Sequence, residues 1–473
     1  MARIVVIGAG VGGLTTASVL ARDGHGVTVL ERDPAPPPLG SAHEAWNGWD
    51  RRGVNQFRML HYFLPRFRLL LDAELPDVVV EADNLGALRH NPIVAAPAEV
   101  TGGVRPGDEQ FDALTARRPV MEAALARAAE QTDGVAIRRG VAVVGLATGE
   151  PRVAGVPHVV GVHTDEGERL DVDLVIDTSG RRSPLPGWLD AIGARPPEEE
   201  LEDCGFVYYG RYFRSADGEL PFAFGPPLQH YDSVSVLTLP ADNGTWGVGF
   251  ITSARDAAAR RLRDVDKWSA ALKQFPLVAH WADGEPLDDE VAIMAKIEDR
   301  HRSFVVDGRP VATGVVAVAD SWACTNPSVG RGATIGFLHA RALRDLLRAC
   351  PLDDSVGLAT AWHDATLREV EPWYRATLTF DRHRLAEIEA QARGERYETD
   401  DPEWELTQAM GHVGGQDPDV MRASIRIAGL LATPDEVLAE PGLLDRVMEL
   451  GQGWRDAPTT GPDRAELVAT LAR

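Results

Sequence analysis

The fold of this chain is decided by Arg3-Ile4-Val5-Val6-Ile7-Gly8-Ala9-Gly10-Val11-Gly12-Gly13. The apolar run 3–7 is typical of a strand buried on both faces of a parallel sheet. Residues 14–24 predict a helix that ends at a glycine, and the apolar run 27–30 predicts a second strand, so the region is expected to form one βαβ unit. The glycines at 8, 10 and 13 have the spacing of a dinucleotide-binding turn.

Each of these glycines has a physical task in such a turn. One allows the tight turn, the second lets the backbone approach a pyrophosphate, and the third lets helix and strand pack closely. The second strand ends at Glu31, where a carboxylate accepts hydrogen bonds from a ribose diol. We therefore expect the ADP half of a dinucleotide to be bound by Gly8, Gly10, Gly12, Gly13, Glu31 and Arg32. This pattern alone allows NAD as readily as FAD.

Composition and charge limit the classes of function. With 473 residues, of which 44% are hydrophobic and 25% charged, the chain is expected to form two or three globular domains. A formal net charge of -23 argues against a nucleic-acid partner, because the phosphates would be repelled. Three cysteines without a C-x-x-C pair favour neither a metal site nor a disulfide framework, and a cytoplasmic setting fits. No run of 18 apolar residues occurs, so stable membrane insertion is not expected.

A second ligand-binding element is predicted in residues 315–336. It combines a buried strand, an acid at Asp320, a loop from Pro327 to Gly332, and the start of a helix. The acid is placed to hold a ribityl or ribose hydroxyl. The amide donors and the positive end of the helix suit the negative charge on the pyrimidine edge of a reduced flavin. This element therefore favours FAD over NAD.

Four motifs in this order resemble those of the FAD-dependent monooxygenase superfamily, which includes aromatic hydroxylases, squalene-epoxidase-like enzymes, flavin halogenases and geranylgeranyl reductases. After the glycine turn, residues 115–125 resemble its Ser-Arg-Pro-x-Leu-Glu segment and residues 177–180 its Asp-Ala-Ser/Thr-Gly strand end. Residues 319–332 resemble its Gly-Asp element and Pro-x-x-Gly-x-Gly loop, with Ala319 in place of the usual glycine. The resemblance implies further FAD contacts from Arg118, Asp177, Gly180, Asp320, Pro327, Gly330 and Gly332.

One histidine is a candidate for the reaction site. Residues 49–61 resemble the Arg-Gly-Val-Pro-Gln-x-x-His stretch of epoxidase-like and hydroxylase-like members, which implies a position beside the flavin. Asn55 replaces the usual proline. His61 is then a polar group near the substrate, although a lone histidine in an apolar stretch also fits a satisfied core position. No other catalytic residue is assigned.

The resemblance implies an α/β fold: a Rossmann-like FAD-binding domain of the GR2 type with a parallel sheet, an inserted substrate domain with an antiparallel sheet, and a C-terminal helical region. We assign residues 1–80, 110–185 and 300–350 to the first, 81–109 and 186–299 to the second, and 351–473 to the third, with a helical stretch over 362–393. The alternating aromatic and polar residues between 200 and 300 predict the antiparallel strands.

Aromatic residues of that sheet are the candidate substrate contacts. The four chosen are Tyr208, Tyr212, Phe224 and Trp246, which suit an apolar or aromatic small molecule. Only one face of a sheet can line a pocket, so for each residue a place in the core between domains stays open.

The resemblance implies a monooxygenase that inserts one oxygen atom from O2 by hydroxylation or epoxidation, through a flavin C4a-hydroperoxide and without a metal, on a secondary metabolite. NADPH, NADH or a separate flavin reductase would supply electrons, and a homodimer is possible. Alternatives are alkene reduction of the geranylgeranyl-reductase type and a flavin-binding scaffold without turnover. Halogenation is disfavoured, because lysine occurs only at 267, 273 and 296 and the Trp-x-Trp-x-Ile-Pro motif is absent.

Overall fold

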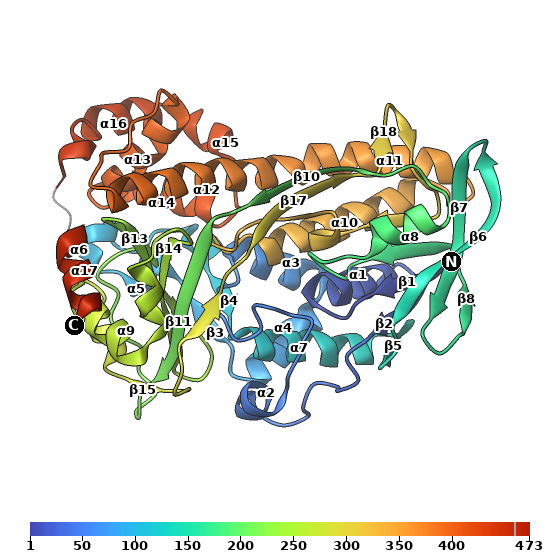
Figure 1. Ribbon diagram of the computed structural model, residues 1–473, viewed down its shortest axis with the longest axis horizontal. Coiled ribbons are helices and arrows are strands. Elements are labelled where there is room, and N and C mark those ends of the chain that lie inside the picture. The colour runs from blue at the N-terminus through green and yellow to red at the C-terminus, as the bar shows by residue number, and fades with distance from the viewer. Residues whose placement is uncertain (458–459) are drawn as a thin grey trace.

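A five-stranded parallel sheet lies in the half of the molecule that contains the N-terminus (Figure 1). The computed structural model describes residues 1–457 and 460–473. The strand order is β20-β9-β1-β2-β5, and every neighbouring pair is parallel. The strands are β1 (Arg3–Ile7), β2 (Gly26–Glu31), β5 (Val135–Arg139), β9 (Leu174–Asp177) and β20 (Val315–Ala317). The predicted βαβ unit and the later buried strands therefore join one sheet.

The two faces of this sheet are covered by different layers. Helices cover one face, and a three-stranded antiparallel sheet of β6, β7 and β8 covers the other. In β1, Ile4 and Val6 pack toward the helices while Val5 and Ile7 pack toward the small sheet, which explains its unbroken apolar run. The covering elements are α1 (Val11–Arg22), α7 (Arg118–Gln131), α10 (Gly332–Ala349), β6 (Val143–Val153), β7 (Val156–Thr164) and β8 (Arg169–Asp171).

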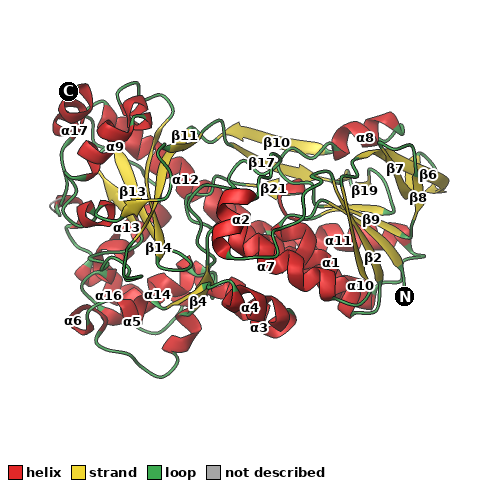
Figure 2. Cartoon of the chain, turned by 90° about the horizontal axis from the view of Figure 1, so that it is seen from below, coloured by secondary structure: helices red, strands yellow, loops and turns green. Residues whose placement is uncertain are grey.

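A larger antiparallel sheet lies at the other end of the molecule (Figure 2). Its order is β12-β13-β14-β11-β15, with β16 also paired to β11. α9 (Val265–Leu272) packs on its outer face through Trp268 and Leu272. The strands are β11 (Phe206–Arg214), β12 (Leu228–Tyr231), β13 (Val234–Pro240), β14 (Thr245–Ser253), β15 (Glu285–Pro286) and β16 (Ala292–Met294). The antiparallel sheet predicted between 200 and 300 is thus present.

Shorter elements complete this part of the chain. They are α2 (Ala42–Gly48), α3 (Pro65–Glu74), α4 (Pro76–Asn84), β3 (Leu88–His90), α5 (Pro92–Ala95), α6 (Ala98–Thr101), β4 (Ala113–Thr115), α8 (Leu185–Ala191), β18 (Val305–Val306) and β19 (Arg309–Pro310). α4 packs in the same core as α1 and α7, through Val78, Val79 and Ala82. The division of the chain into the domain ranges given above stays a prediction.

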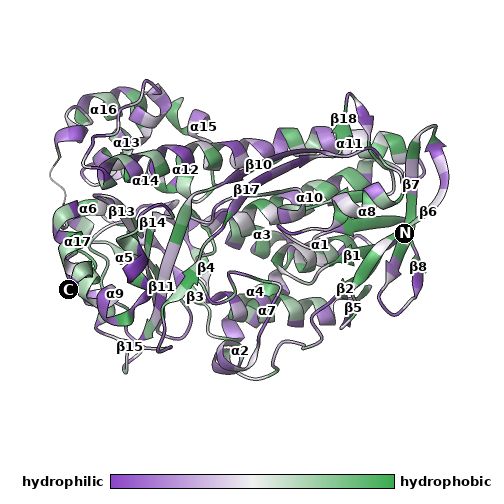
Figure 3. Ribbon diagram, viewed as in Figure 1, coloured by the Kyte–Doolittle hydropathy of each residue, from purple (hydrophilic) through white to green (hydrophobic). Residues whose placement is uncertain are grey.

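A charged ladder runs between the two halves of the molecule. β10 (Glu198–Asp203) pairs antiparallel with β17 (Glu298–Ser303), and β21 (Ala323–Cys324) adds to β17. Both long strands are hydrophilic along their length (Figure 3). Arg375 and Arg382 of a C-terminal helix pair with Glu200 and Glu202 of β10. These ion pairs dock the helical region on the ladder.

The C-terminal region is helical, as expected, but the helix predicted over 362–393 is two helices. α11 (Ser355–Glu369) and α12 (Glu371–Ala392) meet at Val370. Pro372 explains the break, because in a continuous helix it could not donate to the carbonyl of Arg368 and its ring would clash with that carbonyl, whereas it is tolerated in the first turn of α12. The remaining helices are α13 (Pro402–Gly414), α14 (Pro418–Ala428), α15 (Pro434–Leu438), α16 (Leu443–Leu450) and α17 (Arg464–Ala472). No helix in the described ranges is long and apolar enough to cross a membrane.

One buried ion pair joins the two halves near their contact. Arg117, just before α7, donates from its guanidinium and its backbone N–H to the carboxylate of Asp242, which follows β13. The Nη2–Oδ2 distance is 2.6 Å, and both side chains are at most 5% exposed. The pair fixes the start of α7 against the antiparallel sheet.

Replacing Asp242 tests this contact. Asp242→Asn leaves a buried guanidinium without its counter-charge, so the free energy of unfolding is expected to fall by about 3–5 kcal/mol. Asp171→Asn is the matched control, because the Arg169–Asp171 pair is about half exposed and such pairs contribute about 0–1 kcal/mol. Urea unfolding of both variants measures the difference. Equal losses would show that the buried pair does not hold the halves together.

Candidate functional site

A large cavity opens at the carboxyl ends of β1, β2 and β9, where ligands bind in open α/β sheets. Its volume is about 1480 Å³, above the roughly 300–1,000 Å³ of a pocket for one small ligand. The glycine turn, the loop 327–332, the antiparallel sheet and the C-terminal helices all contribute to its lining. The cavity has room for a dinucleotide and a second molecule.

The glycine turn has the geometry of a phosphate cradle. Gly8 has a φ of +102°, which a residue with a side chain rarely adopts. A Cβ on Gly13 would lie 1.9 Å from the carbonyl oxygen of Gly8, so this glycine is needed for helix–strand packing. A Cβ on Gly10 would project into open space at the cavity, and no side chain caps the N-terminus of α1 there. The free amides of that turn suit an anionic pyrophosphate.

The predicted ribose ligand Glu31 is already engaged by the protein. One carboxylate oxygen accepts from the N–H of Ala9 at 2.8 Å and pairs with Arg51, and the other accepts from the N–H of Asp33 at 2.9 Å. Arg32 lines the same wall of the cavity. Glu31 thus holds the turn around a bound nucleotide and keeps acceptor capacity for a ribose hydroxyl.

Arg51 is a site residue that the sequence did not reveal. It is 4% exposed and lies between Glu31 and Glu122, with Nη1 2.7 Å from Glu122. Burial raises the pKa of Glu122, but Arg118 and Arg51 more than offset this, so Glu122 is ionised. Glu122 could have pointed to Arg51. It lies on the otherwise apolar face of the predicted helix 119–131, and a buried carboxylate requires a cationic partner.

Arg118 and His61 continue this chain of charges into the cavity. Arg118 Nε donates to Glu122 at 2.6 Å, and its Nη1 lies 3.2 Å from His61 Nε2. His61 Nδ1 donates to the carbonyl of Met59 at 3.1 Å, so Nε2 is the acceptor. Burial, then the Arg118 charge, lowers the pKa of His61 to about 3. His61 is therefore a neutral group at the cavity wall with both ring nitrogens in use, which argues against proton transfer.

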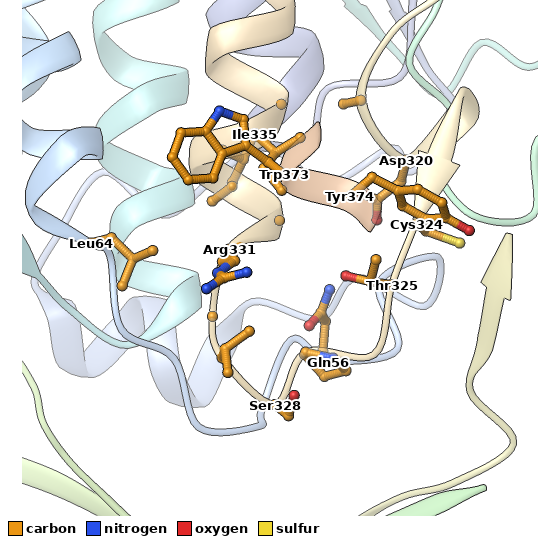
Figure 4. Close-up of a pocket in the computed structure, with 18 of the residues that line it drawn as sticks. Gln56, Leu64, Asp320, Cys324, Thr325, Ser328, Arg331, Ile335, Trp373 and Tyr374 are labelled. Carbon is orange, nitrogen blue, oxygen red and sulfur yellow. The ribbon is translucent and has the colours of Figure 1, made fainter. Parts of the chain in front are cut away.

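Asp320 stands at the cavity on a strained turn. Ala319, which replaces the family's glycine, has a φ of +55°, and its N–H donates to Nδ1 of His339 at 3.1 Å. The Asp320 carboxylate faces the cavity (Figure 4) and has no hydrogen-bond partner within residues 1–457 and 460–473. Burial raises the pKa of Asp320. The charges of Arg181 and Arg118 lower this pKa, but by less than burial raises it. An unpartnered carboxylate there fits a ribityl hydroxyl.

The loop 327–332 is held by buried polar groups behind it. Asn326 donates from its backbone N–H to Asp299 at 2.7 Å, and both its amide and the Ser328 hydroxyl donate to Asp381 of α12. Burial raises the pKa of Asp381 to about 8, so this carboxyl is protonated at neutral pH. Pro327, Gly330 and Gly332 line the cavity on the loop, with Gly330 at a φ of +67°. The loop presents its backbone at the start of α10.

Asp177 does not reach the cavity, which corrects its assignment as a cofactor contact. It is fully buried, and its carboxylate accepts hydrogen bonds from the N–H and hydroxyl of Ser179 and from the hydroxyl of Ser183. Gly180 lies on the turn that these bonds shape, and it does line the cavity. The acid positions the turn instead of touching a ligand.

The four aromatic substrate candidates also lie off the cavity. The hydroxyl of Tyr208 donates to Asn326, and that of Tyr212 donates to Met59 O, so both secure the segments that face the cavity. Trp246 packs on the opposite face of the sheet, where its indole donates to Trp281 O, and Phe224 is 58% exposed. The prediction of these contacts was wrong.

The reason lies in what covers the inner face of the sheet. Leu60 lies against the backbone of Gly210, Gly247 and Gly249, where any Cβ would meet its side chain. The segment 59–61 therefore separates the aromatic residues of β11 from the cavity. The sheet contributes aliphatic residues from other strands instead, namely Leu228, Leu237, Leu239, Ile293 and Met294.

The C-terminal helices supply the other apolar wall. The sequence left the role of 351–473 open, yet α12, α13 and α14 all line the cavity. The spacing of residues 373, 376, 380 and 383 could have indicated this role, because it puts these residues on one face of a helix. The apolar lining residues of these helices include Trp373, Phe380, Trp404, Leu406, Met410 and Ile425.

Comparisons with known proteins agree with this geometry. A family model described as FAD dependent oxidoreductase matches residues 3–92. Protein Rv3254 of Mycobacterium tuberculosis is 30% identical over 383 residues, which cover 78% of this chain and 77% of that protein. PqsL, a probable FAD-dependent monooxygenase of Pseudomonas aeruginosa, is 15% identical with a TM-score of 0.59, covering 83% of this chain and 98% of PqsL.

A further solved structure, CabE, is an aromatic hydroxylase from angucycline biosynthesis. It is 20% identical with a TM-score of 0.57, covering 91% of this chain and 76% of CabE. At these identities the two structures establish the likeness of fold. The α/β fold with a parallel sheet, separate antiparallel sheets and a C-terminal helical region is thus confirmed, and the match to the FAD dependent oxidoreductase model supports FAD dependence.

Gly10 offers a test of the cradle. Gly10→Val fits sterically in the protein but fills the space of the pyrophosphate, so at least two charge-assisted hydrogen bonds of about 1.5–3 kcal/mol each are lost. We expect FAD affinity to fall about a hundredfold or more at unchanged thermal stability of the apoprotein. Gly145→Val in β6, away from the cavity and equally unhindered, is the control. Normal FAD content in the Gly10 variant would show that the cofactor does not bind at this turn.

His339 makes stability depend on pH. Burial lowers its pKa to about 3 from 6.5, so below about pH 6.5 the unfolded chain binds a proton that the folded site does not. Stability is therefore fully present above pH 6.5 and falls by up to about 1.4 kcal/mol per pH unit as the pH decreases toward 3. His339→Gln should show a smaller slope in urea unfolding between pH 7 and 5.5. The exposed His43→Gln is the control, and equal slopes in both variants would refute this assignment.

Proposed function

Because this chain belongs to the family of protein Rv3254 and is an FAD-dependent oxidoreductase with the fold of flavoprotein monooxygenases, we propose that it inserts one oxygen atom from O2 into an apolar or aromatic small molecule. The product would be a hydroxylated or epoxidised compound. Electrons would come from NADPH, NADH or a separate flavin reductase.

One observation carries this proposal: the dinucleotide cradle and an apolar chamber belong to a single cavity. Gly10, Asp320 and the loop 327–332 line one part, and aliphatic and aromatic residues of the antiparallel sheet and C-terminal helices line the other. Apolar walls that exclude water are what a reactive oxygen-transfer site requires. A simple nucleotide-binding scaffold needs no such chamber beside the cradle.

The chain's own residues have distinct tasks in this scheme. FAD, when bound and reduced, supplies the two electrons that activate O2. The turn 8–13 and Asp320 would hold its phosphates and ribityl chain, and the amides at the start of α10 would stabilise negative charge near Gly332. His61, neutral and fixed by Arg118, keeps its proton on Nδ1 and shapes the wall. The apolar lining orients the substrate and excludes water.

The test is isotopic. Purified protein reconstituted with FAD is reduced with NADPH, with NADH or by a flavin reductase, then mixed with ¹⁸O2 and a panel of aromatic and polyene compounds. We expect one ¹⁸O atom in a product by mass spectrometry and oxygen uptake that depends on the compound. The FAD-deficient Gly10→Val variant is the negative control.

Two outcomes contradict the proposal. Anaerobic saturation of an alkene without oxygen incorporation would assign reductase chemistry instead. Protein that binds FAD but neither takes electrons nor consumes oxygen would assign a scaffold without turnover.

A further inference from the structure

The C-terminal helices build one part of the wall of the cavity. α12 presents Trp373, Ala376, Phe380 and His383 to it, a face about 15 Å long at 1.5 Å per residue. We call the space between this face and the facing residues of α13 and α14 the helical chamber. Those facing residues are Trp404, Leu406, Met410 and Ile425. The chamber is long and mainly apolar.

The polar group at the far end of the chamber has its hydrogen bonds within the protein. His383 Nδ1 lies 2.8 Å from the hydroxyl of Tyr397, and Nε2 lies 2.9 Å from a carboxylate oxygen of Asp401. Its ring stacks on Trp404 at 4.8 Å between centroids. His383 therefore offers a flat aromatic surface to a ligand and no free ring nitrogen.

Arg331, at the near end, is different. Its Nη1 donates to Thr377 of α12 at 3.1 Å, and its buried Nε has no hydrogen-bond partner. No carboxylate within residues 1–457 and 460–473 lies within 4 Å of its guanidinium. Figure 4 shows the side chain among the residues that line the cavity, which include Leu64 and Trp373. A partly buried guanidinium with no counter-charge and an unpartnered Nε is costly, so its presence points to an anion that binds there.

The nearest acid cannot supply that anion. Asp381, one turn along α12 from Thr377, is protonated at neutral pH because burial raises its pKa to about 8. Arg331 itself stays a cation, although burial lowers its pKa to about 10. By contrast, Arg375, which also lines the cavity from α12, is paired with Glu200 and Glu371. Arg331 is thus positioned for an anionic group of a ligand.

We propose that the helical chamber binds an elongated, mainly apolar molecule that ends in a carboxylate or a comparably acidic group, and that Arg331 anchors this group. The proposal deepens the oxygen-transfer function, on which it rests for its role as a substrate site. The hydrogen bond from Arg331 to Thr377 directs the guanidinium toward α12, whereas the free amides for the cofactor's phosphates lie at the N-terminus of α1.

A matched pair of probes tests the anchor. Biphenyl-4-carboxylate and biphenyl-4-carboxamide have nearly the same shape and differ in charge, and isothermal titration calorimetry of the FAD-loaded protein measures their affinities. We expect the acid to bind at least tenfold more tightly than the amide, because the amide oxygen still accepts a hydrogen bond but lacks the negative charge that pairs with the guanidinium. Arg331→Gln should remove this preference, Arg331→Lys should retain part of it, and the control Arg375→Gln should leave it unchanged.

A second variant tests the chamber independently of the anchor. Leu406→Trp on α13 narrows the chamber near Trp404 and His383, away from Arg331, so it should weaken biphenyl-4-carboxylate at least tenfold while benzoate, which is short enough to stay beside Arg331, binds as in the wild type. Unchanged affinity for both acids would overturn the placement of the ligand in the chamber.

Other outcomes separate this proposal from its rivals. Equal affinity of acid and amide for the wild type, or no binding of the acid, overturns it. If Arg331→Gln lowers FAD occupancy or shifts the flavin reduction potential while the acid keeps its preference, the guanidinium serves the cofactor and the proposal is wrong. The acid preference needs no turnover, so it can hold even where the ¹⁸O experiment fails.

Discussion

The buried guanidinium of Arg51 is the contact on which the rest of the site depends. It joins Glu31 at the end of β2 to Glu122 on α7, and through Arg118 the chain of charges reaches His61. Burying such charges is costly, and removing one leaves its partners uncompensated. Three segments, the end of β2, residues 51–61 and the start of α7, are therefore fixed together in one arrangement around the cavity.

That arrangement also decides what the antiparallel sheet can contribute. Arg51 and His61 lie at the two ends of the segment that carries Leu60, and Leu60 lies on the glycines of β11 and β14. Because the segment covers the aromatic side chains of β11, the cavity is lined instead by aliphatic residues of the sheet and by the C-terminal helices. The same charges that shape the dinucleotide cradle thus define the apolar part of the cavity.

Local pattern was enough to predict the first βαβ unit, because its signals all lie within thirty residues: an unbroken apolar run, a glycine turn and an acid at Glu31. It was not enough for Tyr212, whose hydroxyl is held by the distant Met59, or for Asp177, whose carboxylate is turned inward by Ser179 and Ser183 of the turn that follows its strand. The face on which Trp246 lies follows from strand register and from what packs on the sheet. Neither is encoded in the alternation of a single strand.

Ala319 shows how tertiary contacts override a local preference. A residue with a Cβ costs about 1–2 kcal/mol in the left-handed region, and the family's glycine avoids that cost. Here His339 accepts the Ala319 N–H from α10, and the methyl group lies where any side chain on Gly12 or Gly336 would collide. The alanine therefore depends on two glycines far away in sequence, which explains why the turn keeps Asp320 in place despite the substitution.

Each side of α12 has a different neighbour, so the side that faces the chamber is separate from the sides that hold the helix in place. Tyr374 and Leu378 are packed in the core behind the parallel sheet, Arg375 and Arg382 pair with β10, and Trp373, Ala376 and Phe380 face the ligand space. Exposed ion pairs contribute only about 0–1 kcal/mol each, so core packing fixes the helix. Ala376 and Phe380 are not part of that core, so substitutions at these two positions leave the packing of α12 and the dinucleotide turn untouched, and the chain can change what it binds without losing its cofactor.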